Sequence, residues 1–301
     1  MTRPVTGVGS LPHNDPAEAA RFVAGTATVP YLPQLPNLDP EEGMLLQWGD
    51  GLCGSGRGPG GLGLAAGAKP GDRARAFVGG TAVLDLLEPG TRRVKTQATG
   101  PLTLAAALAA GGFRGDPRPC LADGLAERIA GHLELLAARL PGTEVTLILD
   151  EPALAVPGSI PGGAGGTGVL ADLIAGFGAG IHCCGDADWD AVARLRPAAL
   201  SVDTASLGPR FADAAPSIAE ALSDGTRMIW GAVPVSSPPL PSVGALVGRV
   251  RRAEGVLVLA GADLAALEAA WVTPACGLAG LTEDQAAAVA ARVIEVAEAL
   301  G

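Results

Sequence analysis

The sequence is poor in aromatic residues, in positive charge and in long apolar runs. Aromatic residues make up only 3% of the chain, so its core must be built mainly from Ala, Val, Leu and Ile. Lys and Arg number 21 against 31 Asp and Glu, which gives a net charge of −10. A chain with this balance lacks the counter-ion release that drives nucleic-acid binding, so we expect no nucleic-acid partner and favour small-molecule chemistry.

Membrane and export signals are also lacking. No uninterrupted apolar run reaches the roughly 18 residues of a spanning helix, and no basic segment followed by an apolar one opens the chain. The interpretation is a cytoplasmic protein without a membrane partner. Five cysteines, an odd number, then favour free thiols and metal ligation over a disulfide framework. Cys53 and Cys120 lie in Gly/Pro-rich segments and are interpreted as incidental.

Strand-like runs alternate with helical patterns along the chain, which is typical of β/α units and a parallel sheet. The last helix is expected to begin after Thr282, where Thr282 and Gln285 form a capping-box pattern. The Gly-rich stretch 49–92 is the exception and is interpreted as an irregular excursion, with a possible hairpin at 77–87. We therefore expect one domain, 1–301, folded as a single (β/α)8 TIM barrel. The expected strands are 6–10, 29–32, 94–101, 143–150, 180–184, 199–203, 227–233 and 270–273.

Polar side chains stand at the ends of several expected strands. Barrel enzymes place their catalytic groups where strands end and the βα loops begin. We therefore expect these side chains to share one mouth. They are Ser10, Thr99, Asp150, Glu151, His182, Cys184, Asp203 and Cys276.

The sequence Ile181-His182-Cys183-Cys184 carries the most specific chemistry. In an extended strand His182 and Cys184 point the same way, with Cα atoms on the order of 6.6 Å apart, while Cys183 faces away. Zinc accepts imidazole nitrogen and thiolate sulfur in a tetrahedral site, and a second thiolate from another strand would complete such a site. The alternative is a buried strand in which the cysteines serve as small hydrophobes.

Five short motifs, in order along nearly the whole chain, resemble those of the catalytic barrel of cobalamin-independent methionine synthases. This family belongs to the uroporphyrinogen-decarboxylase-like barrels. The motifs are Val8-Gly9-Ser10-Leu11-Pro12, Thr99-Gly100-Pro101, Leu149-Asp150-Glu151-Pro152, His182-x-Cys184 and Thr273-Pro274-Ala275-Cys276-Gly277.

The resemblance implies a zinc-dependent methyltransferase that makes methionine from homocysteine. By position, the zinc ligands would be His182, Cys184, Cys276 and the acidic Asp203, where the family usually has glutamate. A zinc-held thiolate keeps its nucleophilicity near neutral pH and would attack a methyl carbon in line.

The resemblance also implies roles for the remaining motif residues. Ser10 would bind the carboxylate of the amino acid, and Asp150 would pair with its ammonium group. Glu151 is a second catalytic candidate beside Asp150, although an acidic residue before a Pro-led turn needs no catalytic explanation. Thr99 would shape the substrate site, although its Gly100-Pro101 turn also explains it.

The methyl donor is left open between methyl-folate and methylcobalamin or a corrinoid protein. The family's N-terminal duplicate barrel has no counterpart in this sequence, and Ser236 replaces the family's proton-relay histidine. Two alternatives to the methyltransferase remain. One is a metal-binding or corrinoid-protein-binding barrel without turnover. The other is a uroporphyrinogen-decarboxylase-like enzyme, which should present arginines near the first strand, where this chain has Arg3 alone.

Overall fold

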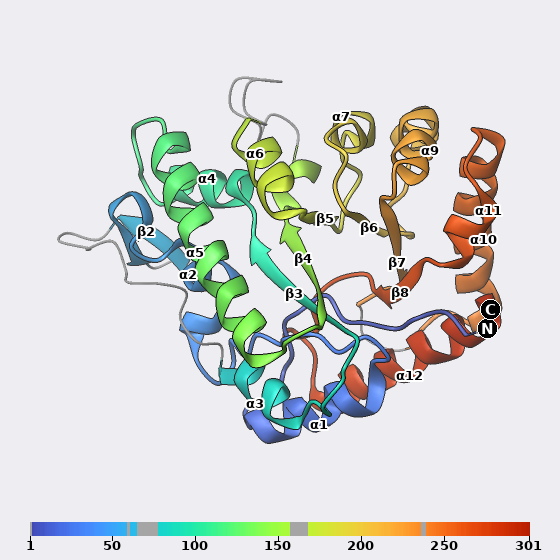
Figure 1. Cartoon of the computed structure of the whole chain (residues 1–301), viewed down its shortest axis with the longest axis horizontal. Coiled ribbons are helices and arrows are strands. Elements are labelled where there is room, and N and C mark those ends of the chain that lie inside the picture. Colours follow the sequence, from blue (N-terminus) through green and yellow to red (C-terminus); the bar gives the residue numbers. More distant parts are fainter. Residues whose placement is uncertain (1, 59–60, 65–77, 157–167, 236–238) are drawn as a thin grey trace.

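The computed structural model describes residues 2–58, 61–64, 78–156, 168–235 and 239–301 (Figure 1). Its centre is a parallel sheet of six strands whose spatial order follows the chain. Helices lie between successive strands in the sequence, as the alternating pattern predicted. The strands are β3 (Arg93–Thr99), β4 (Glu144–Asp150), β5 (Gly180–Cys183), β6 (Ala199–Asp203), β7 (Arg227–Val233) and β8 (Trp271–Pro274).

Helices cover the outer face of this sheet (Figure 1). The first turns of two of these helices are capped by side chains: Asp15 accepts from the backbone of Ala17, and Thr282 and Gln285 form the expected capping box. Among the described residues, no helix is both long and apolar enough to cross a membrane. The helices are α1 (Pro16–Thr26), α4 (Pro101–Ala110), α5 (Arg118–Arg139), α6 (Gly168–Phe177), α7 (Trp189–Arg194), α8 (Pro209–Asp213), α9 (Ala215–Ser223), α10 (Val243–Leu259), α11 (Leu264–Glu268) and α12 (Glu283–Leu300).

The two expected N-terminal strands appear as bridged segments rather than as strands of the sheet. Val5 pairs with Val272 of β8, and Tyr31 pairs with Lys95 of β3. Val29 donates to the carbonyl of Val5 at 2.9 Å. The segments thus lie side by side between the two edges of the six-stranded sheet, joined by isolated bridges instead of a continuous ladder.

The inner face of the sheet has an apolar floor and a polar layer. A buried cluster of Val29, Ile148, Ala199, Ile229 and Trp271 is separate from the larger core between sheet and helices. Alternation along each strand places the next inward residues closer to the carboxyl ends. These are buried and polar, namely Ser201 on β6, Thr273 on β8, and Lys95 and Gln97 on β3. Barrel interiors are usually filled by Val, Ile and Leu, so this polar layer is a departure from the common pattern.

The stretch 49–92 contains more regular structure than expected. The hairpin expected at 77–87 is wrong, because Val78–Leu86 forms helix α3, which packs near α1 in Figure 1. Two glycines and three β-branched residues weaken the helical signal of this segment, whereas the Glu42 carboxylate accepts from the Val78 backbone. Residues 59–60 and 65–77 lie outside the described part. The other elements here are η1 (Pro40–Glu42), α2 (Met44–Gly49), η2 (Leu52–Gly54), and the antiparallel pair β1 (Ser55–Gly58) and β2 (Gly61–Leu64).

The interpretation of Cys53 and Cys120 as incidental thiols is wrong. The structure joins them in a disulfide with Cα atoms 5.5 Å apart, and it leaves Cys183, Cys184 and Cys276 free. The bond ties η2 to the first turn of α5. The two cysteines are 67 residues apart in the sequence. The number of cysteines in a sequence does not indicate which of them lie close together in the fold.

We predict that this disulfide stabilises the fold by about 2–4 kcal/mol, because it closes a long loop in the unfolded chain. The double variant Cys53→Ser/Cys120→Ser should lose this amount in urea unfolding relative to the oxidised protein. Wild-type protein kept in reductant is the matched control and should unfold like the variant. Mass spectrometry after alkylation of unreduced, denatured protein should show three modified thiols, and five would contradict the pairing.

Candidate metal centre

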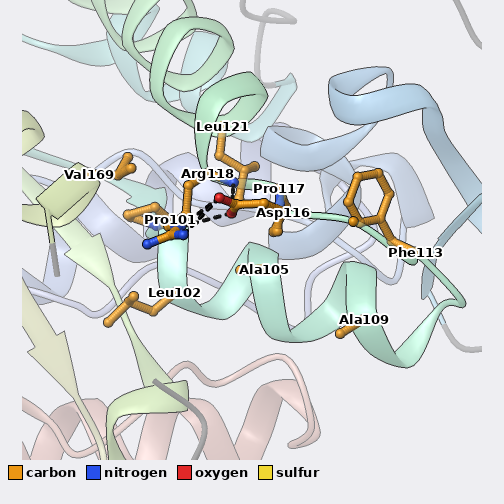
Figure 2. A pocket seen from close by; sticks show the side chains of 11 residues that line it. Pro101, Leu102, Ala105, Ala109, Phe113, Asp116, Pro117, Arg118, Leu121 and Val169 are labelled. Atoms are coloured by element: carbon orange, nitrogen blue, oxygen red, sulfur yellow. Dashed lines mark hydrogen bonds and ion pairs between the residues drawn. The ribbon is translucent and has the colours of Figure 1, made fainter. Parts of the chain in front are cut away.

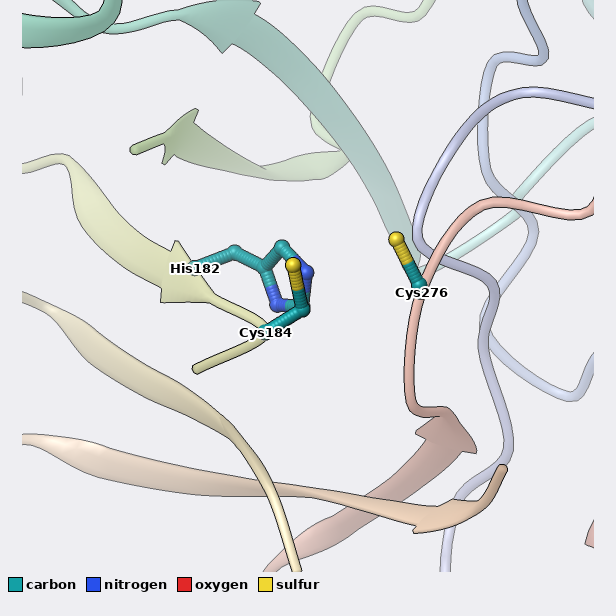
Figure 3. Close-up of side chains that lie close together, drawn as sticks. All are labelled: His182, Cys184 and Cys276. Carbon is teal, nitrogen blue, oxygen red and sulfur yellow. The ribbon is translucent and has the colours of Figure 1, made fainter. Parts of the chain in front are cut away.

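One His and two Cys side chains meet at the carboxyl ends of the strands. Candidate ligand atoms of His182, Cys184 and Cys276 all lie within 4.8 Å of one another. His182 belongs to β5 and Cys184 directly follows it, while Cys276 follows β8 and points toward them from the other side (Figure 3). The segment after β8 thus brings the second thiol to His182 and Cys184. Cys183 is fully buried in the apolar core, on the opposite face of the strand.

The imidazole of His182 is oriented by its neighbour on β6. Its Nδ1 lies 2.9 Å from the hydroxyl of Ser201, and its Nε2 is buried without a hydrogen-bond partner. When Nδ1 donates to the hydroxyl, Nε2 carries the lone pair that a metal requires. A buried nitrogen without a partner is costly in an empty site, and metal ligation would satisfy it.

The two thiols behave as a coupled pair. A hydrogen bond with Cys276 lowers the pKa of Cys184, and the same bond raises the pKa of Cys276 to about 12. The bond thus favours the thiolate form of Cys184 and the thiol form of Cys276. A divalent cation would replace that proton, because thiolates are the form that binds metal.

This donor set fits zinc. One imidazole nitrogen and two thiolates are typical zinc ligands, and three protein ligands are the usual number for a site that keeps a position for substrate. The fourth predicted ligand, Asp203, is not part of the group. Its Oδ1 accepts from the Ala205 backbone at 2.8 Å and its Oδ2 accepts from the Ser206 hydroxyl, so ligation by Asp203 stays a prediction.

A cavity of about 430 Å³ opens over these three side chains. Five of the predicted site residues line it together, namely Ser10, Asp150, His182, Cys184 and Cys276. Ser10 lies directly against Gly277, where an added Cβ would strike its hydroxyl. A glycine after Cys276 therefore allows the first segment to approach the metal ligands.

Asp150 is a buried carboxylate that faces this cavity. It is 7% exposed, and its Oδ1 has no hydrogen-bond partner. Burial raises its pKa, while the charges of Lys95 and His182 act in the opposite direction. A buried acceptor without a partner at a cavity wall is suited to a cationic group of a ligand.

Glu151 and Thr99 do not line the cavity. Glu151 is fully buried and accepts from the backbone of Leu102 and Thr103, both at 2.8 Å, so it occupies the first turn of α4. The hydroxyl of Thr99 donates to the carbonyl of Met44 at 2.6 Å and holds α2. Their contacts are those of structural residues, and their expected roles in catalysis and substrate binding stay predictions.

Sequence reasoning missed several residues near the site. Gln34 and Met44 line the cavity, and Lys95 lies beneath it beside His182. Burial lowers the pKa of Lys95 to about 8, although the nearby Asp150 raises it. A lysine within the otherwise uncharged strand Val94–Thr99 was the available signal for an inward cation.

A second cavity, of about 370 Å³, lies between α4 and the start of α5 (Figure 2). Most of its walls are apolar, and its two charged side chains, Asp116 and Arg118, form an ion pair at 2.8 Å. None of the three candidate ligands lines it. Its lining therefore supplies no chemistry comparable with that of the cavity over His182.

Comparison with known proteins agrees with the motifs. Residues 168–299, which contain His182, Cys184 and Cys276, match the family described as cobalamin-independent synthase, catalytic domain. The match covers 132 of the 301 residues of the chain. No curated protein matches it. The structure is similar to that of a B12-independent methionine synthase from Shewanella sp. W3-18-1, solved in complex with selenomethionine. The two structures align with a TM-score of 0.65 over 100% of this chain and 98% of the other. Because the sequence identity is only 14%, the similarity is one of fold.

This match and the likeness of fold support the resemblance that the five motifs indicated. The matched residues begin at α6 and end in α12, so they include β5 to β8 and all three candidate ligands. Ser10, Thr99, Asp150 and Glu151 lie outside the matched part. Their placement rests on the structure alone.

We predict that the purified protein binds one zinc ion per chain through the cluster. Cys184→Ser and Cys276→Ser should each lower the zinc affinity at least tenfold, because loss of a thiolate removes one of three ligands. Cys183→Ser is the matched control, since its sulfur lies next in sequence but faces the core, and it should retain zinc. Metal analysis after dialysis measures this, and equal zinc content in all variants would contradict the assignment.

We also predict that Glu151 makes the stability of the fold depend on pH. Burial raises its pKa from 4.5 to about 7, against hydrogen bonds from Thr103 and Leu102. The folded state therefore holds the proton more tightly, and this contribution to stability is complete below about pH 4.5 and lost as pH rises through about 7. The loss is on the order of 3 kcal/mol.

The test compares the wild type with Glu151→Gln in urea unfolding at several pH values. Residue 151 cannot titrate in the variant. The free energy of unfolding of the variant minus that of the wild type should therefore be smallest at low pH and should increase as the pH rises to about 7. A buried carboxyl group that does not interact with Glu151, such as Glu42, cancels in the difference. Parallel pH curves for the two proteins would show that Glu151 does not titrate in this window.

Proposed function

We propose that the protein is a zinc-dependent methyltransferase that methylates the thiol of homocysteine to give methionine. The observation that carries the proposal is the convergence of His182, Cys184 and Cys276 on a cavity that a buried carboxylate also faces. The match of residues 168–299 to the family of cobalamin-independent synthases supports the reaction type. Soft sulfur ligands favour thiol chemistry, whereas His-rich zinc sites favour the activation of water.

Different residues of the chain would bind different groups of an amino thiol. Zinc, when bound, supplies the Lewis acidity that keeps a thiol deprotonated near neutral pH. His182, Cys184 and Cys276 would hold it, with Asp203 as the proposed fourth ligand. Asp150 would accept the ammonium group of homocysteine through its unpartnered Oδ1, and Ser10 would donate to the carboxylate.

The methyl donor remains a choice between a methyl-folate and a corrinoid, free or protein-bound. Ser236, which replaces the family's relay histidine, lies outside the described residues, so its position gives no argument for either donor. We further propose that the segments bridged through Val5 and Tyr31 occupy the first two strand positions of an eight-stranded barrel. Their hydrogen bonds to β8 and β3 support this closure.

The arginine near the first expected strand does not support the decarboxylase alternative. Arg3 is 2% exposed and forms a buried ion pair with Glu254, so its guanidinium is not available to a substrate carboxylate. Among the described residues that line the cavity over His182, none is an arginine. A substrate with several carboxylates would meet no positive charge on these walls.

The test is methionine formation from homocysteine by the zinc-loaded protein with methyl-folate and with methylcobalamin in parallel. At least one donor should support turnover, and Asp150→Asn should raise the KM for homocysteine about tenfold or more, because it removes the charge that pairs with the ammonium group. Cys183→Ser serves as the active control. Zinc binding without turnover by either donor would instead favour the non-catalytic alternative.

A further inference from the structure

Lys95 is a buried cation with an unusual position inside the barrel. It is 3% exposed, and among the described residues no carboxylate lies within salt-bridge distance of it. Its ammonium group donates to the backbone carbonyl of Val8 and, at 3.0 Å, to Oε1 of Gln97. Burying an ammonium group costs desolvation free energy, so a lysine at this position indicates a role beyond filling space in the core.

Gln97 continues the same row of side chains on the inner face of β3. Its Nε2 donates to the carbonyl of Leu32 at 2.7 Å. Its side chain also lies against Gly9, where an added Cβ would come within 2.9 Å of Gln97 Cδ. Lys95 and Gln97 together therefore hold both N-terminal segments from inside the barrel, each through a backbone carbonyl.

The main chain pairs the two N-terminal segments with their neighbours less continuously than it pairs the strands of the sheet. β3 and β4 pair over seven residues, whereas the two N-terminal segments meet their neighbours only through isolated bridges. Toward the cavity, the main chain holds Gly9–Leu11: the Gln34 amide donates to the Gly9 carbonyl at 3.4 Å, the Leu11 amide donates to the Gln34 carbonyl at 2.9 Å, and the Leu278 amide donates to the Ser10 carbonyl at 2.7 Å. The Val8 carbonyl, in contrast, accepts from the Lys95 ammonium group. Val8 and Ser10 nonetheless form part of the cavity wall. The side-chain donors Lys95 and Gln97 thus supplement these main-chain bonds, and Lys95 does so at Val8, where the cavity wall begins.

We propose that Lys95, supported by Gln97, is a positioning residue that fixes the cavity edge Val8–Ser10 for binding of the amino-acid part of the substrate. The proposal rests on the proposed function only in naming that ligand. Loss of Lys95 should leave the metal ligands in place, because these belong to β5 and to the segment after β8, while the Val8 carbonyl loses its donor.

The experiment compares Lys95→Met with Thr96→Val, a matched control from the same strand. Thr96 faces outward and its buried hydroxyl lies 2.8 Å from Nε2 of His132, so its loss also removes one buried hydrogen bond. In cobalt-substituted proteins, homocysteine binding is followed through the visible spectrum of the metal. We expect Lys95→Met to weaken homocysteine binding at least tenfold with unchanged metal content, and Thr96→Val to bind like the wild type.

A second measurement decides the inference without the ligand. Hydrogen exchange at the backbone amides of residues 9–11 should be faster in Lys95→Met and unchanged in Thr96→Val. Gln97→Met serves if Lys95→Met does not fold, with faster exchange expected at both segments. Equal exchange and equal binding in Lys95→Met and Thr96→Val would overturn the inference. Absence of homocysteine binding by the wild type would overturn the proposed function, and the exchange comparison would still decide the role of Lys95.

Discussion

The site depends on the parallel register of β4, β5 and β6. In this register Asp150 is the direct partner of His182, and His182 is the direct partner of Ser201. A carboxylate, an imidazole and the hydroxyl that orients the imidazole therefore stand in one row on the inner face of the sheet. A slip of one residue in β5 would turn His182 toward the helices and bring Cys183 inward, which would remove the nitrogen ligand and misplace the thiol. The β-branched and aliphatic residues that face the helices, such as Ile181 and Val202, fix this register by burial.

Period-two alternation within a strand was readable from the sequence, and the residues it governs were predicted well. It gave the common direction of His182 and Cys184 and the burial of Cys183. It does not reveal which partners the acidic side chains bind at the ends of the strands. Glu151 follows β4 and turns to the first turn of α4, and Asp203 closes a local turn with Ala205 and Ser206. These carboxylates find backbone donors that only the folded chain provides.

Long-range contacts between segments of weak pattern were beyond the sequence. Nothing local connects Cys53 with Cys120, or Lys95 with the carbonyl of Val8. The first segment likewise has the composition of a strand but forms only bridges. The ring of Tyr31 fills the space beside Gly7 that a Cβ would need, and Gln97 does the same at Gly9. Side chains that cross the interior have taken the place of continuous main-chain pairing, and no propensity scale contains that information.

The scarcity of aromatic residues has a consequence for the cavity. All four tryptophans, Trp48, Trp189, Trp230 and Trp271, are at most 1% exposed, and the cavity over the cluster is walled in part by Gly43, Gly277, Ala279 and Gly280. Small residues leave about 430 Å³, a volume in the range of sites that hold a drug-sized ligand. An amino thiol is smaller than such a ligand. For the proposed reaction, the rest of the cavity would have to admit the methyl-bearing end of a second substrate in line with the sulfur.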